Sequence, residues 1–202
     1  MTDDEFIASV IKAREESVVY FSSAMKPERE RWVVHEFLDN LGLLHGETEI
    51  ASCRDEPPDV TYADARFEVK EILDQGRRRH EEYKESLRQA KQAKTPADLL
   101  EGYTPKEINY TEVCGLISKS IVELKPYAPS TQKTLDLLFY VNLEHVHGYV
   151  QSELPSPAEF KRYGWRSVSF VAGPMSVVLC AAVSAPSFLR ACEGQVRRQK
   201  PA

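Results

Sequence analysis

The chain has 202 residues, of which 42% are hydrophobic, and a net charge of −5, so it is long enough for one large domain with a buried core. No stretch approaches the ~20 apolar residues of a membrane span, and the acidic start, residues 1–5, is unlike a signal or transit peptide. We therefore expect a cytoplasmic protein with no membrane partner. The cysteines are widely spaced, which favours free thiols over disulfides or a zinc site.

The charge is unevenly distributed along the chain. Residues 1–60 contain 14 acidic and 6 basic residues, whereas residues 61–202 contain 17 acidic and 20 basic residues. The net negative charge argues against indiscriminate nucleic-acid binding, and any basic surface belongs to the later part of the chain.

Two helices are predicted in the first 42 residues. The first begins after Asp3 or Asp4, either of which can serve as its N-cap. The second begins at Pro27 and ends at Gly42, with an apolar stripe facing the core. Glu36 lies at the border of that stripe, so it either reaches a metal site or faces solvent.

A β-hairpin is predicted over residues 60–72. Its second half, residues 67–72, alternates aromatic or β-branched residues with charged ones, and a short turn separates the two halves. Residues two apart on a strand are separated by about 6.6 Å and project their side chains to the same face, so Glu68 and Lys70 project together. The pairing of the two halves of the hairpin brings Asp59 toward them. Two carboxylates and an ammonium at a sheet edge can hold a hard divalent cation beside a water molecule.

A long polar helix is predicted directly after the hairpin, from residue 77 to about residue 94. Its basic residues of interest are Arg77, Arg78, Arg79 and Lys84. They form either a phosphate-contacting arm or a projecting, solvent-exposed helix with salt bridges to the glutamates among them. Gln75, between the hairpin and this helix, is a candidate for orienting water or substrate.

Four other polar residues are candidate ligands with a simpler alternative. Glu56 could add a carboxylate, but its place before two prolines favours a turn. His35 is interpreted as a histidine on a helix surface. His145 and His147 could present two imidazoles to one metal, but their place at the end of a strand near a glycine favours a loop.

The remaining chain predicts further helices and a buried strand. Residues 104–107 and 156–159 are helix-start signals with proline at the first helical position, and another helix begins at Thr111. Residues 135–141 form the most apolar run and predict a central strand covered on both faces. Residues 166–183 predict a closing hairpin, followed by a short helix.

These elements predict an α/β fold, with a mixed sheet flanked by helices. We expect one domain over residues 1–194, in which residues 76–128 form an extra, projecting helical section after the motif strand. Residues 195–202 are basic and are expected to be a disordered tail.

The hairpin motif, Pro58-Asp59 followed by Glu68-Val69-Lys70, resembles that of the PD-(D/E)XK nuclease superfamily, which has the restriction-endonuclease-like fold. The chain contains four acid-x-Lys triplets, but only this one lies in a strand-like run and follows the single Pro-Asp pair at hairpin distance. The chain is also similar to an uncharacterised bacterial family that is grouped with those nucleases as endonucleases.

The resemblance implies metal-dependent hydrolysis of nucleic-acid phosphodiester bonds, with DNA rather than RNA as substrate and 5′-phosphate products. Asp59, Glu68 and the Val69 carbonyl would hold one or two Mg²⁺ or Mn²⁺ ions. Lys70 would orient and help deprotonate the attacking water, its pKa lowered by the metal's charge and partial burial. Glu36 would complete the ligand shell. A homodimer is a further implication.

Two other functions remain open. The chain could be a non-catalytic nucleic-acid-binding or protein-assembly module on the same fold, in which the motif charges are solvated residues of an edge strand. It could also be a small-molecule hydrolase that uses His145 and His147. The sequence has no Gly-rich phosphate loop and no Gly-x-Ser-x-Gly elbow, which argues against P-loop enzymes and α/β-hydrolases.

Overall fold

The protein is represented by a computed structural model that describes residues 1–55, 57–100, 102–124 and 127–199. Its helices are α1 (Asp3–Tyr20), α2 (Lys26–Leu41), α3 (Arg79–Ala90), α4 (Tyr110–Glu123), α5 (Pro129–Gln132), α6 (Pro157–Lys161) and α7 (Ser187–Ala191), with 3₁₀ turns η1 (Ser23–Met25), η2 (Glu47–Glu49) and η3 (Pro96–Leu99). Its strands are β1 (Ile50–Ser52), β2 (Val60–Tyr62), β3 (Ala65–Ile72), β4 (Lys106–Asn109), β5 (Asp136–Val141), β6 (Val146–Val150), β7 (Ser167–Ala172), β8 (Met175–Ala181) and β9 (Val196–Arg198). None of the helices in these described ranges combines the length and hydrophobicity that a membrane crossing requires.

The chain folds into two compact units. The smaller unit consists of Met1–Lys26 and Leu73–Pro105, and the larger unit consists of Pro27–Ile72 and Lys106–Ala202. The helical section that the sequence places at residues 76–128 is therefore divided differently in the structure. Its second half, which includes α4, belongs to the larger unit, while α1 joins α3 in the smaller one.

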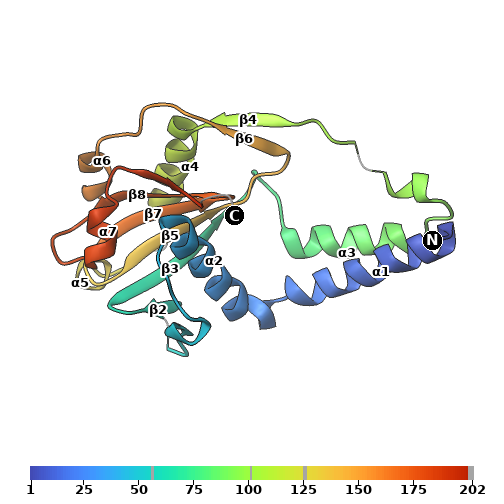
Figure 1. The fold of residues 1–202 in the computed structure, drawn as a ribbon, viewed down its shortest axis with the longest axis horizontal. Helices are drawn as coiled ribbons and strands as arrows, with labels where there is room; N and C mark the ends of the chain where they lie inside the picture. Colours follow the sequence, from blue (N-terminus) through green and yellow to red (C-terminus); the bar gives the residue numbers. More distant parts are fainter. Residues whose placement is uncertain (56, 101, 125–126, 200–202) are drawn as a thin grey trace. The chain divides into compact units, whose positions relative to one another are not determined.

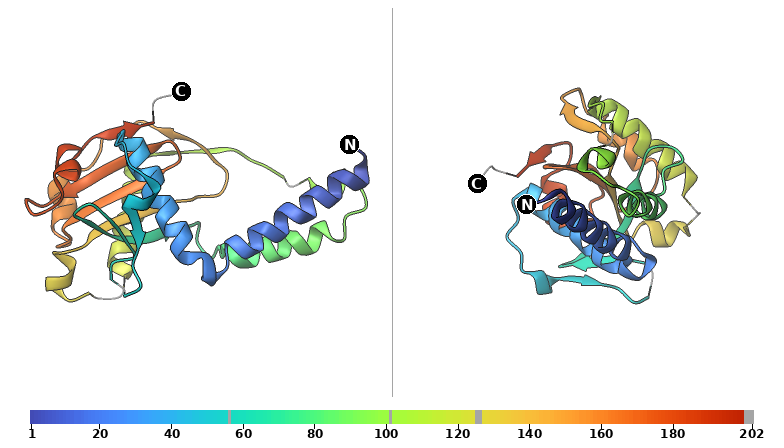
Figure 2. Two further views of the ribbon diagram at one scale, coloured as in Figure 1. Left: turned by 60° about the horizontal axis from the view of Figure 1, so that its bottom comes forward. Right: turned by 90° about the vertical axis from the view of Figure 1, so that its right-hand side faces the viewer.

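The smaller unit is built on a pair of helices. Figures 1 and 2 show α1 and α3 lying side by side and running in opposite directions. The Phe21 ring stacks on Tyr83 with the centroids 4.5 Å apart, and the Arg79 guanidinium lies 3.9 Å from the Phe21 centroid. Lys91 and Glu15 form an ion pair at 2.7 Å. An aromatic stack capped by a cation therefore joins α1 to the start of α3, and an exposed ion pair joins α1 to the residue that follows the end of α3.

The larger unit is organised around a seven-stranded mixed sheet with the strand order β1-β2-β3-β5-β7-β8-β9. The central strands β3, β5 and β7 are parallel, and antiparallel strands extend the sheet on both sides. A separate parallel pair is formed by β4 and β6. The predicted α/β fold with a mixed sheet is confirmed, and so is the buried central position of β5 (Figure 1).

Helices cover both faces of this sheet, and the alternation of side chains along β3 decides which face each motif residue occupies. Phe67 and Val69 pack in one buried cluster with α2. Ile72 packs in the other cluster with α4 and the facing residues of β5. Because side chains alternate along a strand, Glu68 and Lys70 share the face of Ile72, on the α4 side of the sheet.

Local sequence signals gave wrong predictions at three places. Residues 104–107 do not start a helix, because β4 pairs there with β6, and the next helix is capped by Asn109, whose side chain accepts from the Glu112 N–H. The N-cap of α1 is Thr2 rather than Asp3 or Asp4. Residues 196–198, expected in a disordered tail, form β9 and pair with β8.

Candidate active site

The β2–β3 hairpin places Asp59 beside the edge of β3. Val60 is the first residue of β2 and pairs with Phe67, at the end of the hairpin away from its turn. The Asp59 N–H, just before it, donates to the Phe67 carbonyl at 3.0 Å. Beyond that point β3 continues without β2, so its edge is open to the Asp59 side chain. The Val69 N–H uses this opening and donates to Asp59 Oδ2 at 2.8 Å.

Three further polar groups converge on the same place. Lys70 Nζ lies 2.5 Å from Glu68 Oε1 and 3.8 Å from Asp59 Oδ2. The Tyr127 hydroxyl donates to Glu68 Oε1 at 2.5 Å. The structure therefore brings together Asp59, Glu68 and Lys70, as the hairpin pattern predicts, and adds Tyr127. We call these four side chains the carboxylate–lysine cluster.

The two carboxylates of this cluster are buried. Asp59 and Glu68 are each 3% exposed, whereas the Lys70 side chain is 27% exposed. Asp59 and Glu68 are therefore not solvated residues of an edge strand. In their ionised forms two carboxylates face one ammonium, so the cluster carries excess negative charge at a place that opens to solvent along Lys70.

One carboxylate oxygen in the cluster has no hydrogen-bond partner. Glu68 Oε2 is buried and accepts no hydrogen bond within the described part of the chain. A buried acceptor without a partner costs about 1–3 kcal/mol, and a cation bound at this oxygen would remove that cost. The unpartnered oxygen and the excess negative charge both favour a cation here.

The donor atoms fit a hard divalent cation. Asp59 and Glu68 supply carboxylate oxygens, and the Val69 carbonyl points to the same side of β3 as its N–H, toward Asp59, because both groups of a strand residue face one neighbour. Oxygen ligands of this kind suit Mg²⁺ or Mn²⁺. No group of three or more His, Cys, Asp or Glu side chains that could hold a metal is found among the described residues. The remaining ligands would therefore be water and substrate oxygens, as Mg²⁺ commonly retains.

Glu36 is not brought into the cluster. It lies on α2, whose buried side chains pack against Phe67 and Val69, on the opposite face of β3 from Glu68. Burial, and then the charge of Asp39, raise the pKa of Glu36. Glu56, the other additional carboxylate considered from the sequence, lies outside the residues that the structure describes.

The basic residues after the motif strand belong to the smaller unit. Arg77 makes two hydrogen bonds to Glu82, from Nε at 2.8 Å and from Nη2 at 3.0 Å, and Lys84 pairs with Glu81 at 3.0 Å. Arg79 covers the Phe21 ring, while Gln75 and Arg78 are exposed. These contacts are typical of a solvent-exposed helix with salt bridges, rather than of an arm that contacts phosphates.

No pattern in the sequence indicates Tyr127, whose hydroxyl donates to one oxygen of the motif glutamate, Glu68. Its ring packs edge-on against Trp165, with the centroids 5.2 Å apart, and this contact holds the hydroxyl toward Glu68. Tyr127 lies 59 residues after Glu68 in the chain, in a connection without a local motif. Only the pairing of β3 with β5, which follows Tyr127, brings the two together.

We predict that Tyr127→Phe lowers the free energy of unfolding by about 1.5–3 kcal/mol, the usual value of a hydrogen bond to a charged group. The buried Glu68 carboxylate then keeps, among the described residues, only Lys70 as a donor. Urea denaturation of both proteins measures the difference. Tyr163→Phe is the matched control, because that hydroxyl accepts from the exposed Arg162, and it should change stability by less than ~0.5 kcal/mol. Equal effects of the two substitutions would contradict this role of Tyr127.

The histidines considered as ligands lie apart from the cluster. His145 occupies a turn with φ of 60°, as the loop interpretation predicts. His147 is an exposed residue of strand β6, so the loop interpretation is wrong for His147. His35 is only partly exposed, and its Nδ1 lies 2.9 Å from Nε2 of His45. The description of His35 as a plain surface histidine is therefore incomplete.

We predict that acid destabilises the protein partly through His35. Burial, and then the neighbouring His45, lower the pKa of His35 below 6.5. The unfolded chain therefore binds a proton at His35 more tightly than the folded chain does. The contribution of His35 to stability is fully present above its pKa in the unfolded chain, and it is lost as the pH falls through its pKa in the folded chain. Asp39 and Glu47 oppose this shift. Urea midpoints at about pH 7.5 and about pH 5.5 should differ less in His35→Gln than in the wild type, and an unchanged difference would rule the effect out.

Comparisons with known proteins give one family and one similar structure. Residues 2–201 match the family DUF1780, described as "Putative endonuclease, protein of unknown function". A solved structure is similar over 98% of this chain and 96% of that one, with 27% identity and a TM-score of 0.63; it is a protein of unknown function from Pseudomonas aeruginosa strain PAO1, described as belonging to the monooxygenase superfamily. No curated protein matches the chain. Because the family model spans nearly the whole chain, the protein belongs to the DUF1780 family.

Proposed function

We propose that the carboxylate–lysine cluster is the catalytic centre of a metal-dependent endonuclease that hydrolyses DNA phosphodiester bonds. The observation that carries the proposal is the buried pair Asp59 and Glu68 around a single ammonium, with Glu68 Oε2 left without a hydrogen-bond partner among the described residues. The family description supports the endonuclease class. The resemblance of the motif to PD-(D/E)XK nucleases supports DNA as substrate.

The metal ligands in this proposal are Asp59, Glu68 and the Val69 carbonyl. Bound there, Mg²⁺ or Mn²⁺ would neutralise the charge that develops on the phosphate oxygens. The hydrogen bonds from Val69 N–H and from the Tyr127 hydroxyl each use one carboxylate oxygen. They fix the orientation of both carboxylates before the ion binds, which lowers the cost of assembling the site.

Lys70 is the group that handles the attacking water. The Lys70 side chain is partly exposed, while its Nζ lies close to both carboxylates. A water on the solvent side can therefore contact Nζ. Lys70 would hold this water in line with the phosphorus and, in its neutral amine form, take the water's proton as the new O–P bond forms, becoming an ammonium. The P–O3′ bond would break at the same time and O3′ would take a proton from solvent water, which leaves a 3′-hydroxyl on one product and a 5′-phosphate on the other. The cluster contains acid–base groups and hard oxygen donors, which suit hydrolysis.

The experiment that tests this proposal is a cleavage assay with the full chain. Supercoiled plasmid and branched DNA are incubated with purified protein and Mg²⁺ or Mn²⁺, and products are resolved on gels. We expect nicking that Asp59→Ala and Lys70→Ala abolish while circular dichroism shows both variants folded. Activity that survives both substitutions would overturn the site, and the absence of any cleavage by the wild type would favour a non-catalytic module on the same fold.

A further inference from the structure

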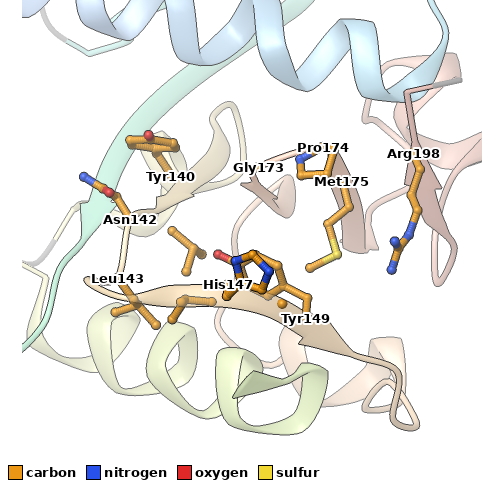
Figure 3. A pocket seen from close by; sticks show the side chains of 12 residues that line it. Tyr140, Asn142, Leu143, His147, Tyr149, Gly173, Pro174, Met175 and Arg198 are labelled. Atoms are coloured by element: carbon orange, nitrogen blue, oxygen red, sulfur yellow. The ribbon is translucent and has the colours of Figure 1, made fainter. Parts of the chain in front are cut away.

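A second site lies at the carboxyl ends of β5 and β7, the position at which open α/β sheets commonly bind ligands. It is a cavity of about 380 Å³, within the roughly 300–1,000 Å³ of small-molecule sites. Figure 3 shows the side chains that matter for its chemistry: Tyr140, Asn142, His147, Tyr149, Met175 and Arg198. They come from the end of β5 and the residues after it, from β6, from the start of β8 and from β9, all within the larger unit.

The charge of this pocket favours an anion. Arg198 is a lining residue, and no aspartate or glutamate lines the pocket. Its Nη2 donates to the Tyr110 hydroxyl at 2.9 Å, and no carboxylate within the described ranges forms an ion pair with it. A guanidinium has five N–H donors, so several remain for a ligand. In a chain of net charge −5, a pocket lined by a cation and by no acidic residue favours an anion such as a phosphate.

The remaining lining favours a flat ring. Tyr140, His147 and Tyr149 present aromatic side chains to the pocket (Figure 3), and Trp32 packs edge-on against Tyr140 with the centroids 5.4 Å apart, which supports that wall. Burial, and then the neighbouring Tyr140, raise the pKa of Tyr149 to about 12. Its hydroxyl is therefore uncharged at neutral pH and does not repel an anion.

The pocket adjoins the strand that carries the cluster. Tyr140 is paired in register with Glu71, the residue after Lys70, and neighbouring strands lie about 4.8 Å apart. The Asn142 side chain donates to Glu71 Oε1 at 3.1 Å, and its backbone N–H donates to the Ile72 carbonyl at 2.9 Å. Arg198 lies on β9, four strands from β3, which is about 19 Å at that spacing. A strand of nucleic acid at the cluster would therefore reach the pocket with a nucleotide several positions away.

We propose that this pocket binds one nucleotide of the substrate strand, with its base against Tyr140, His147 and Tyr149 and its phosphate on Arg198. Stacking on aromatic side chains accepts every base, and an arginine pairs well with phosphate oxygens. The choice of a nucleotide rests on the endonuclease proposal. The pocket residues are distinct from the cluster, so binding and cleavage are measured separately.

Calorimetry with deoxyadenosine 5′-monophosphate tests the pocket in the full chain, without a need for cleavage. Arg198→Gln, which retains a donor for Tyr110, should weaken binding about 10-fold or more. His147→Ala, at an exposed position, should weaken it about fivefold or more. Arg197→Gln, the neighbour on β9 that does not line the pocket, is the matched control and should bind as the wild type. Deoxyadenosine, which lacks the phosphate, should bind wild type and Arg198→Gln equally weakly.

The possible results separate the two proposals. Nucleotide binding that depends on Arg198 in a protein that cuts no DNA would support the pocket and overturn the endonuclease. If the wild type cleaves DNA but does not bind the nucleotide, the pocket proposal alone is overturned. The same holds if Arg198→Gln and His147→Ala bind the nucleotide with the affinity of the wild type. Inorganic phosphate that binds as tightly as the nucleotide would also overturn it, because the aromatic lining would then contribute nothing.

Discussion

Lys70→Met is expected to reduce DNA cleavage by about 10²–10⁴-fold, the usual contribution of a positioned general acid or base. Methionine keeps most of the length and apolar volume of the lysine stem but removes the ammonium, which lies 2.5 Å from Glu68 Oε1 and 3.8 Å from Asp59 Oδ2. The attacking water then loses the group that orients it and accepts its proton. Initial rates of cleavage of a labelled duplex, at saturating Mg²⁺, measure the loss.

The chain offers matched controls for this substitution. Lys84 and Lys161 end two of the other acid-x-Lys triplets, and each pairs with a carboxylate, Lys84 with Glu81 and Lys161 with Glu193. Lys84→Met and Lys161→Met should cleave at the wild-type rate. A uniform fall of the rate in all three variants would mean that general charge, rather than the position of Lys70, supports activity. An unchanged rate in Lys70→Met would exclude it from catalysis.

Arg166→Met is expected to lower the free energy of unfolding by about 3–5 kcal/mol, because it leaves a buried charge without its partner. The partner is Asp136, which is fully buried at the start of β5. Arg166 binds both oxygens of this carboxylate and also donates to the Asp64 carbonyl in the β2–β3 turn. Ser167 Oγ and the Arg66 N–H complete the set of donors, at 2.8 and 2.9 Å. Urea denaturation measures the loss.

A double variant separates the unpaired charge from lost packing. Asp136→Asn combined with Arg166→Met removes both charges, and it should be more stable than Arg166→Met alone. Arg162→Met, at an exposed arginine stacked on Tyr163, is the control and should cost less than ~1 kcal/mol. If Arg166→Met costs no more than this control, Asp136 is not held by Arg166 in the way described.

The part of the site that could be predicted from sequence is the part that is local. Asp59 and Glu68 lie within one hairpin, where alternation and a short turn fix the pairing, and the structure has that hairpin at β2 and β3. The end of α2 could also be predicted locally, because Gly42 follows its last residue. Gly42 has a φ of 75°, a conformation that glycine adopts more readily than other residues.

The part that could not be predicted depends on contacts between distant segments. Tyr127 reaches Glu68 only because β5 lies parallel to β3. Arg166 reaches Asp136 from the residue just before β7, the strand next to β5. At β4 the local helix-start signal was overridden by pairing with β6, some 40 residues later in the chain. Helix capping preferences amount to about 1 kcal/mol, which long-range pairing can exceed. Glu36 had the right spacing on its helix, but the helix lies on the other face of the sheet.

Calorimetric titration with Mn²⁺ tests most directly whether the carboxylate–lysine cluster is a cation site. The wild type should bind the ion, and Asp59→Asn and Glu68→Gln should lose that binding, because each replaces a carboxylate oxygen that the ion needs. Lys161→Met should bind as the wild type. Binding of equal affinity and stoichiometry in the wild type and in both carboxylate variants would contradict the cluster as a metal-dependent catalytic centre.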